Sequence, residues 1–215
     1  AKFVPSGTLT FYNSDITPGG DNTSTLKENP IEGLPRKLKL PVTGVTATEI
    51  ANIVPGRKIG EGSSPSITGI VENLGGPIPT GTGNVEIITS GDQYPNGTHT
   101  GVPLFSITGK GTGAQATVTV AGNVVTTVNV TTSGSGYVNG ETLGITTSNI
   151  GGGSGARVGV KEHGNFDTIY LTSVRGENFT NSETIVYYTD QNDEATRTST
   201  SASVNGSSTL IDDRF

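Results

Sequence analysis

An internal repeat with a period of about 42 residues constrains the fold of this chain more than any other feature. Residues 85–97 (VEIITSGDQYPNG) match residues 128–140 (VNVTTSGSGYVNG) at an offset of 43, and a weaker third copy places Phe179 opposite Tyr137. A repeat of this length predicts a fold assembled from several copies of one supersecondary unit.

A second element recurs between these copies. Residues 109–120 (GKGTGAQATVTV) resemble residues 151–160 (GGGSGARVGV), and in both a glycine-rich stretch leads into a run with strand-like composition. A chain rich in Gly, Ser and Thr produces short matches by chance. Two different elements that alternate at constant spacing argue against a chance origin.

Each unit reads as short β strands joined by tight turns. Residues 118–120 and 124–130 are rich in β-branched side chains and alternate with a period of two, as strands do. Gly134 permits a positive φ, and Asn139-Gly140 is a strong turn signal before a short strand at 141–145. The recurring Tyr94, Tyr137 and Phe179 are predicted to be structural aromatics that cover apolar surface, although aromatic rings can also stack on sugars.

These patterns predict an all-β fold of tandem small β modules, sandwich-like or prism-like, with less than a tenth of the chain in helix. Only residues 46–54 come close to a helical pattern, for two or three turns at most. The predicted regions and repeat units are an extended, Pro-rich N-terminal arm at 1–60, repeated β units at 61–188 (near 85–127, 128–168 and 169–188), and a polar tail with an apolar hook at 189–215.

Composition excludes several classes of function. The chain has a net charge of −6 and no sizeable basic cluster, so we predict no nucleic-acid partner. It lacks a run of about 20 apolar residues, so we predict no membrane span. Only 31% of its residues are hydrophobic and 32 are Gly. A chain with so small a core favours partner subunits, so we expect a homo-oligomer or a multi-copy component of an assembly.

No catalytic, cofactor-binding or metal-binding residues are predicted. His99 and His163 are 64 residues apart, which does not match the repeat, and we expect both in exposed loops. Residues 109–111 (GKG) lack the Ser or Thr of a phosphate-binding loop. The acidic groups at 190–194 and 212–213 lack the ligand spacing of a calcium loop. We therefore predict that the chain is not an enzyme.

The repeat resembles a Gly-Ser-Gly-Tyr β repeat of structural proteins from tailed phages, particularly myoviruses of marine cyanobacteria. The resemblance is carried by residues 132–143 (TSGSGYVNGETL) and 151–160, and it extends over roughly residues 85–188. The first copy departs from the pattern at Asp92-Gln93, and the third copy lacks its glycine pair. The resemblance implies a virion protein, assembled in the host cytoplasm.

Two functions of different class fit this sequence. One is a structural component of the virion exterior, either a head decoration protein or a tail, baseplate or fibre element, that docks on other virion proteins. The alternative is a receptor- or carbohydrate-binding adhesin module. The structural function predicts apolar assembly contacts near both ends of the chain, at Phe3, Leu9, Phe11, Tyr12, Leu210, Ile211 and Phe215.

Overall fold

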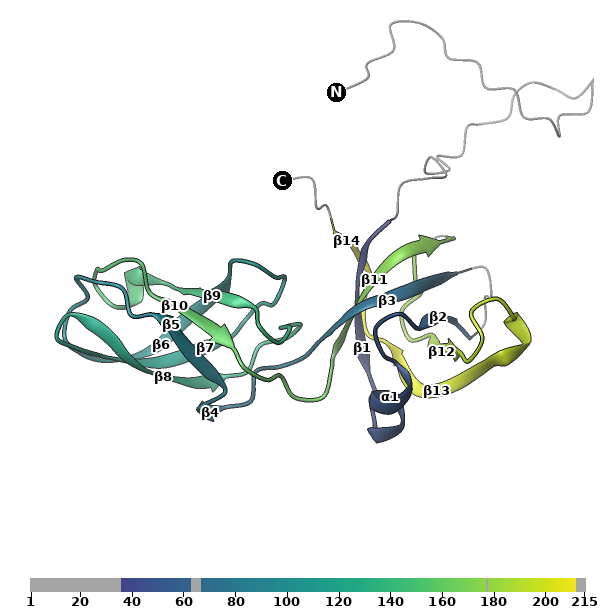
Figure 1. Ribbon diagram of the computed structural model, residues 1–215, viewed down its shortest axis with the longest axis horizontal. Helices are drawn as coiled ribbons and strands as arrows, with labels where there is room; N and C mark the ends of the chain where they lie inside the picture. Colours follow the sequence, from purple (N-terminus) through teal and green to yellow (C-terminus); the bar gives the residue numbers. More distant parts are fainter. Residues whose placement is uncertain (1–35, 63–66, 177, 212–215) are drawn as a thin grey trace, which may run out of the picture. The chain divides into compact units, whose positions relative to one another are not determined.

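The structure is a computed structural model that describes residues 36–62, 67–176 and 178–211, and these residues form an almost entirely β protein (Figure 1). This confirms the predicted all-β fold class. The elements are β1 (Leu38–Thr43), α1 (Ala47–Asn52), β2 (Lys58–Glu61), β3 (Thr68–Gly75), β4 (Gly81–Thr82), β5 (Val85–Thr89), β6 (Gly97–Ser106), β7 (Gln115–Ala121), β8 (Val124–Thr132), β9 (Thr142–Ile145), η1 (Thr147–Asn149), β10 (Arg157–Val160), β11 (Thr168–Arg175), β12 (Thr184–Tyr188), η2 (Glu194–Thr196), β13 (Arg197–Val204) and β14 (Thr209–Leu210).

The strands form two antiparallel sheets, and one sheet is inserted into the sequence of the other. The order of the first sheet is β11-β3-β2-β12-β13-β1-β14, and an additional pairing of β1 with β11 closes six of its strands into a ring. The order of the second sheet is β4-β8-β7-β6-β9-β10-β5. Its strands all lie between β3 and β11 in the chain. In Figure 1 it is therefore teal to green, whereas the first sheet combines purple-blue strands with green and yellow ones. We call residues 76–166 the inner module, and residues 36–75 with 167–211 the outer module.

Both modules are built from two copies of one three-stranded unit. The four units are β1-β2-β3, β5-β6-β7, β8-β9-β10 and β11-β12-β13. In each module the first strand of either unit pairs with the third strand of the other unit, and the two middle strands pair with each other. The first unit thus pairs with the fourth and the second with the third. The modules are nested, which corrects the predicted tandem order.

The two units of the inner module share a β-bulge at the same place in their recurring elements. The ladder between β10 and β5 shifts register directly after Arg157, and the ladder between β7 and β8 shifts directly after Gln115. These residues occupy the same place in the recurring elements 151–160 and 109–120. A β-bulge that recurs at the same place shows that the sequence repeat is also a structural repeat.

Each tyrosine of the inner module inserts into a glycine loop of the opposite unit. The Tyr94 hydroxyl accepts a hydrogen bond from Ala156 N–H at 3.2 Å, and the Tyr137 hydroxyl accepts one from Ala114 N–H at 3.1 Å. A Cβ on the glycine three residues before each alanine would lie 2.3 or 2.1 Å from a ring carbon. Only glycine therefore leaves room for the ring. We call this the tyrosine–glycine contact.

One turn geometry recurs in the units of both modules. Gly56, Gly140 and Ser182 have φ values of +85°, +81° and +67°. Each donates its N–H to a carbonyl in the third strand of its own unit, at 2.7–2.9 Å. The residue three positions earlier is buried in each case; these residues are Ile53, Tyr137 and Phe179. Tyr94 and Gly97 hold the same relation, with the Gly97 φ at +144°. The described residues therefore contain four repeats rather than the predicted three.

The predicted boundary at residue 60 is wrong. Residues 36–60 contain β1, α1 and most of β2, and the side chains of Leu38 and Leu40 are fully buried. The alternating Leu38-x-Leu40-x-Val42 pattern points one face of β1 into the core, and this burial outweighs the loop signal of the prolines. Residues 1–35 of the predicted arm lie outside the described residues.

The predicted polar tail at 189–215 also contains core structure. β13 carries the third strand of the fourth unit, and its Ala202 and Val204 are buried. Small polar residues alternate with these apolar ones, so the strand is half-buried despite its polar composition. The fourth unit therefore runs to residue 204 and not to residue 188.

Equal losses of stability are expected from removing either tyrosine hydroxyl. Tyr94→Phe and Tyr137→Phe each leave a buried backbone N–H without its acceptor, which costs ~1–3 kcal/mol. Urea unfolding measures the effect. The half-buried Tyr187, whose ring lies 5.9 Å from the guanidinium carbon of Arg57, provides the control Tyr187→Phe. If the control costs as much as the other two, the hydroxyl bonds are not the cause.

A capped carboxylate should make stability fall in acid. Glu49 is buried in α1 and accepts hydrogen bonds from the N–H groups of Thr46 and Ser201 at 2.9 and 3.0 Å. Burial raises its pKa, but a hydrogen bond from the Thr46 hydroxyl, together with these two, outweighs burial and lowers the pKa to about 2. The folded pKa thus lies below the ordinary value of 4.5. The contribution of the Glu49 carboxylate to stability is complete above pH 4.5 and is lost as the pH falls toward 2.

Glu49→Gln should therefore lower the free energy of unfolding by ~1–3 kcal/mol at neutral pH. The difference from the wild type should shrink between pH 4.5 and pH 2, because the wild-type carboxyl becomes protonated there. Urea unfolding over this range measures both quantities. A difference that stays constant with pH would contradict the assignment to the Glu49 carboxylate.

Candidate functional site

The two histidines bind neighbouring backbone. His99 Nε2 lies 3.1 Å from the carbonyl oxygen of Pro95, and His163 Nδ1 lies 2.6 Å from that of Gly164. Both rings are half-buried, not fully exposed as predicted. In the described part of the chain, no group of three or more His, Asp or Glu side chains is placed to hold a metal ion. His99 lies in β6 and not in a loop as predicted.

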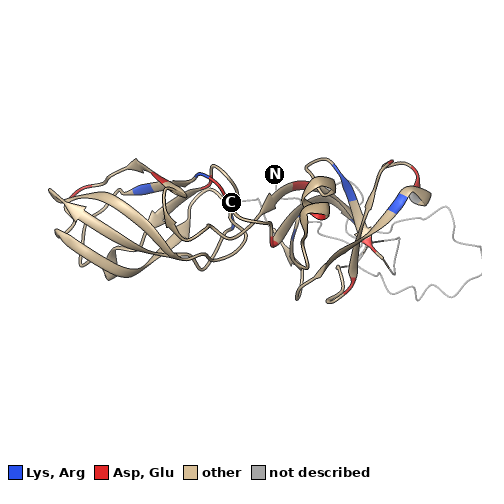
Figure 2. Cartoon of the chain, turned by 90° about the horizontal axis from the view of Figure 1, so that it is seen from below, with Lys and Arg blue, Asp and Glu red and all other residues tan. Residues whose placement is uncertain are grey.

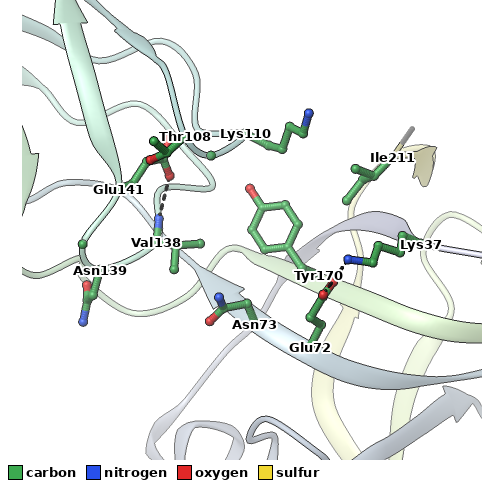
Figure 3. Close-up of a pocket in the computed structure, with 12 residues that line it drawn as sticks. Lys37, Glu72, Asn73, Thr108, Lys110, Val138, Asn139, Glu141, Tyr170 and Ile211 are labelled. Atoms are coloured by element: carbon green, nitrogen blue, oxygen red, sulfur yellow. Dashed lines mark hydrogen bonds and ion pairs between the residues drawn. The ribbon is translucent and has the colours of Figure 1, made fainter. Parts of the chain in front are cut away.

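A cavity of about 340 Å³ has mixed polar and apolar walls (Figure 3). Its lining comes from both modules: Lys37, Glu72, Asn73, Thr108, Gly109, Lys110, Val138, Asn139, Gly140, Glu141, Tyr170 and Ile211. Lys37 and Glu72 form an ion pair across one wall at 2.6 Å. The cavity is thus a candidate site that sequence analysis did not identify.

Glu141 has a structural task in this cavity. Its side chain is buried, Oε2 accepts a hydrogen bond from Val138 N–H at 3.0 Å, and Oε1 accepts one from Gly111 N–H at 3.2 Å (Figure 3). The carboxylate therefore ties the Tyr137 turn to the glycine loop that receives the Tyr137 ring. Charge-assisted bonds of this kind are stronger than neutral ones.

The back of the cavity is formed by hydrogen bonds that link the two modules. The Tyr170 hydroxyl donates to the Gly136 carbonyl at 2.5 Å, and Gly136 N–H donates to Asp167 Oδ1 at 3.0 Å. Burial raises the pKa of Tyr170, and the negative charges of Glu141 and Asp167 raise it further. The phenol thus keeps its proton and remains a donor. The Glu141 carboxylate and the Tyr170 phenol are therefore both hydrogen-bonded to backbone groups.

Lys39 lies beside the same bonds. Its ammonium donates to the Lys110 carbonyl at 3.0 Å. Burial lowers the pKa of Lys39, while the charges of Asp167 and Glu141 raise it. These contacts hold backbone loops in place. They do not form the pairing of a nucleophile with a base that covalent catalysis uses.

The predicted assembly contacts fall into two groups. Phe3, Leu9, Phe11, Tyr12 and Phe215 lie outside the described residues. Leu210 and Ile211 lie in or beside β14, which pairs with β1 so that Leu210 is opposite Leu38.

The Leu210 side chain is 64% exposed, and Ile211 N–H donates to the Lys37 carbonyl at 3.0 Å. The described chain begins two residues before β1 and ends one residue after β14. The terminal segments 1–35 and 212–215 are therefore attached close to one strand pair.

Of the eight Tyr and Phe side chains among the described residues, six are buried, Tyr187 is half-buried and Phe105 is exposed. Tyr94, Tyr137, Phe166, Tyr170, Phe179 and Tyr188 are buried. Phe105 is 49% exposed and is the only exposed aromatic in this part of the chain. Charged residues are sparse and mixed in sign on the ribbon of Figure 2. Sequence analysis missed Phe105 because it lies outside the segments that match between the sequence repeats.

No family model, curated protein or solved structure matches this chain. No helix among residues 36–62, 67–176 and 178–211 is long and apolar enough to cross a membrane.

Removing the Glu141 carboxylate should loosen the inner module. Glu141→Ala leaves the buried N–H groups of Gly111 and Val138 without their acceptor, and we expect a loss of ~1–3 kcal/mol in urea unfolding. Glu183 occupies the corresponding place in the fourth unit, and its carboxylate makes no hydrogen bond to the described residues. Glu183→Ala is thus the matched control and should change stability little. Equal losses in both variants would contradict this role for Glu141.

Proposed function

We propose that this chain is a non-enzymatic structural component of the exterior of a tailed-phage virion, present in many copies. It serves as a head decoration protein or as a tail, baseplate or fibre element that docks on other virion proteins. The observation that carries the proposal is the strand pair β1–β14. This pair is the attachment point of the long N-terminal segment, and it presents the exposed Leu210.

The structural role of the repeat motif supports a function as a scaffold protein. In the inner module the tyrosine and the glycine loop of the Gly-Ser-Gly-Tyr pattern meet each other in the tyrosine–glycine contact. Their hydrogen bonds are made within the module, so the residues that carry the phage resemblance hold the fold together. A motif used in this way suits a building block of a large assembly.

The apolar residues near both ends of the chain support the proposed docking function. Segments that become ordered on a neighbouring subunit gain their affinity from a few buried apolar anchors. Residues 1–35 contain four such residues, Phe3, Leu9, Phe11 and Tyr12, and join the fold next to β14. Leu210 adds an exposed apolar side chain at the same strand pair. These candidate anchors favour docking on a neighbouring protein.

The adhesin alternative has less support. Sugar-binding surfaces commonly use exposed aromatic rings, and among the described residues only Phe105 is an exposed aromatic. In the cavity of Figure 3, the Glu141 carboxylate and the Tyr170 phenol bind backbone groups, and the Glu72 carboxylate pairs with Lys37. We therefore propose the structural function alone.

Deleting residues 1–30 should abolish decoration of virus particles. Particles assembled without this protein are mixed with purified full-length or truncated chain, and occupancy is measured by cryo-electron microscopy. Leu210→Ser should lower occupancy, because it removes an exposed anchor. Ile50→Ser changes an apolar residue of α1 that is 42% exposed and provides the matched control. Full occupancy by the truncated chain would show that the arm is not the docking element. Absence of the chain from purified particles by mass spectrometry would refute the virion function itself.

A further inference from the structure

One outward face of the inner module carries an unusual set of side chains. The face is formed by β6, β9, β10 and β5, which are neighbours in that order. Leu143 on β9 and Val158 on β10 are fully buried. Because side chains alternate along a strand, their neighbours Gly144 and Gly159 point outward. The centre of the face is thus formed by two glycines.

The register places the other outward residues in two rows. Phe105 is opposite Gly144, which is opposite Arg157. In the second row Gly159 lies between Thr142 and Glu86, and Ile107 N–H donates to the Thr142 carbonyl at 2.9 Å. The first row therefore holds an aromatic ring and a cation, and the second holds an apolar side chain and an anion.

The face is largely apolar and exposed. Ile88, Phe105 and Ile107 are 54%, 49% and 43% exposed. They are three of the five large hydrophobic side chains exposed in the described part of the chain. A Cβ on Gly144 would lie 2.2 Å from the Phe105 ring, and one on Gly159 would lie 3.2 Å from Ile88 Cδ1. The Phe105 side chain on β6 therefore lies over Gly144, and the Ile88 side chain on β5 lies over Gly159.

Two oppositely charged side chains of this face, Arg157 and Glu86, have no ion-pair partner among the described residues. Arg157 donates to the carbonyl of the preceding Ala156 at 2.8 Å, and neither Arg157 nor Glu86 forms a salt bridge within 4.0 Å there. Glu86 is exposed and Arg157 is half-exposed. A face with one unpaired cation and one unpaired anion is complementary to itself, because a two-fold rotation brings each charge to the opposite one.

We propose that this face binds the same face of a second copy of the chain about a two-fold axis. Glu86 then pairs with the partner's Arg157, and Arg157 pairs with the partner's Glu86. Phe105, Ile88 and Ile107 are buried against the equivalent apolar side chains. A second copy fits better than an unrelated protein because the face supplies both members of its own charge pair. The proposal adds a self-association surface to the proposed function and does not depend on particle docking.

Charge reversal tests this pairing in the full chain, by analytical ultracentrifugation over a range of concentrations. Glu86→Arg places two arginines against each other in a homodimer, and Arg157→Glu places two glutamates together. Like charges in an interface are strongly unfavourable, so each variant should associate at least about tenfold more weakly than the wild type. An equimolar mixture of the two variants restores both opposite-charge pairs and should recover the wild-type association. The exposed Glu162 supplies a matched control, Glu162→Arg, which should associate normally.

Ile88→Glu is a second, independent variant for the case that Arg157→Glu does not fold. Ile88 is 54% exposed, so its replacement should spare the fold and weaken association by a similar factor. Thermal unfolding confirms that each variant is folded. A wild-type chain that stays monomeric at every concentration overturns the proposal. Unchanged association in Glu86→Arg and Ile88→Glu, or a mixture that fails to recover, also overturns it. None of these results bears on decoration of particles, so this proposal and the proposed function can fail separately.

Discussion

The tyrosine–glycine contact is the interaction on which the inner module depends. Tyr137 belongs to one unit and Gly111 to the other, and the ring occupies the place of the missing Cβ while its hydroxyl accepts from Ala114 N–H. Tyr94 repeats the arrangement in the opposite direction. Each unit thus completes the core of the other. This explains how a chain with only 31% hydrophobic residues can build a buried core from short strands.

The outer module shows what happens when this contact is absent. It keeps the turn with positive φ, but the buried residues before the turn are Ile53 and Phe179, which have no hydroxyl. The first strands of its units, β1 and β11, pair along four residues and close the ring of strands. In the inner module the ends of the corresponding strands are joined through single hydrogen bonds, such as Val125 N–H to the Ser90 carbonyl at 3.0 Å. A backbone ladder and a tyrosine hydroxyl are therefore two ways to hold the same pair of units.

The sequence could predict the features that have a local signal, but not those that depend on which units pair. Alternating strands and the Asn139-Gly140 turn have local signals, and the structure has strands and a turn there. The first unit went unnoticed because Ile53 and Pro55-Gly56 replace the aromatic and the Asn-Gly pair. The nested pairing has no local signal, since the pattern of one unit does not tell which other unit it meets. The cavity around Glu141 and the outward face around Phe105 both follow from that pairing, so neither could be predicted before it was known.

The nested order also separates the surfaces that the two proposals use. The inner module is continuous in sequence, whereas the outer module forms only when residues 38–75 meet residues 168–204. The entropy of closing a long connection grows slowly with its length, so an inserted module of this size adds little to the cost of that closure. Both terminal segments join the outer module at β1 and β14, and the face with Phe105 belongs to the inner module. Docking through the ends would therefore use different residues from self-association through the inner module. Under the two proposals, one subunit would bind a neighbouring virion protein and a second copy of itself through different side chains.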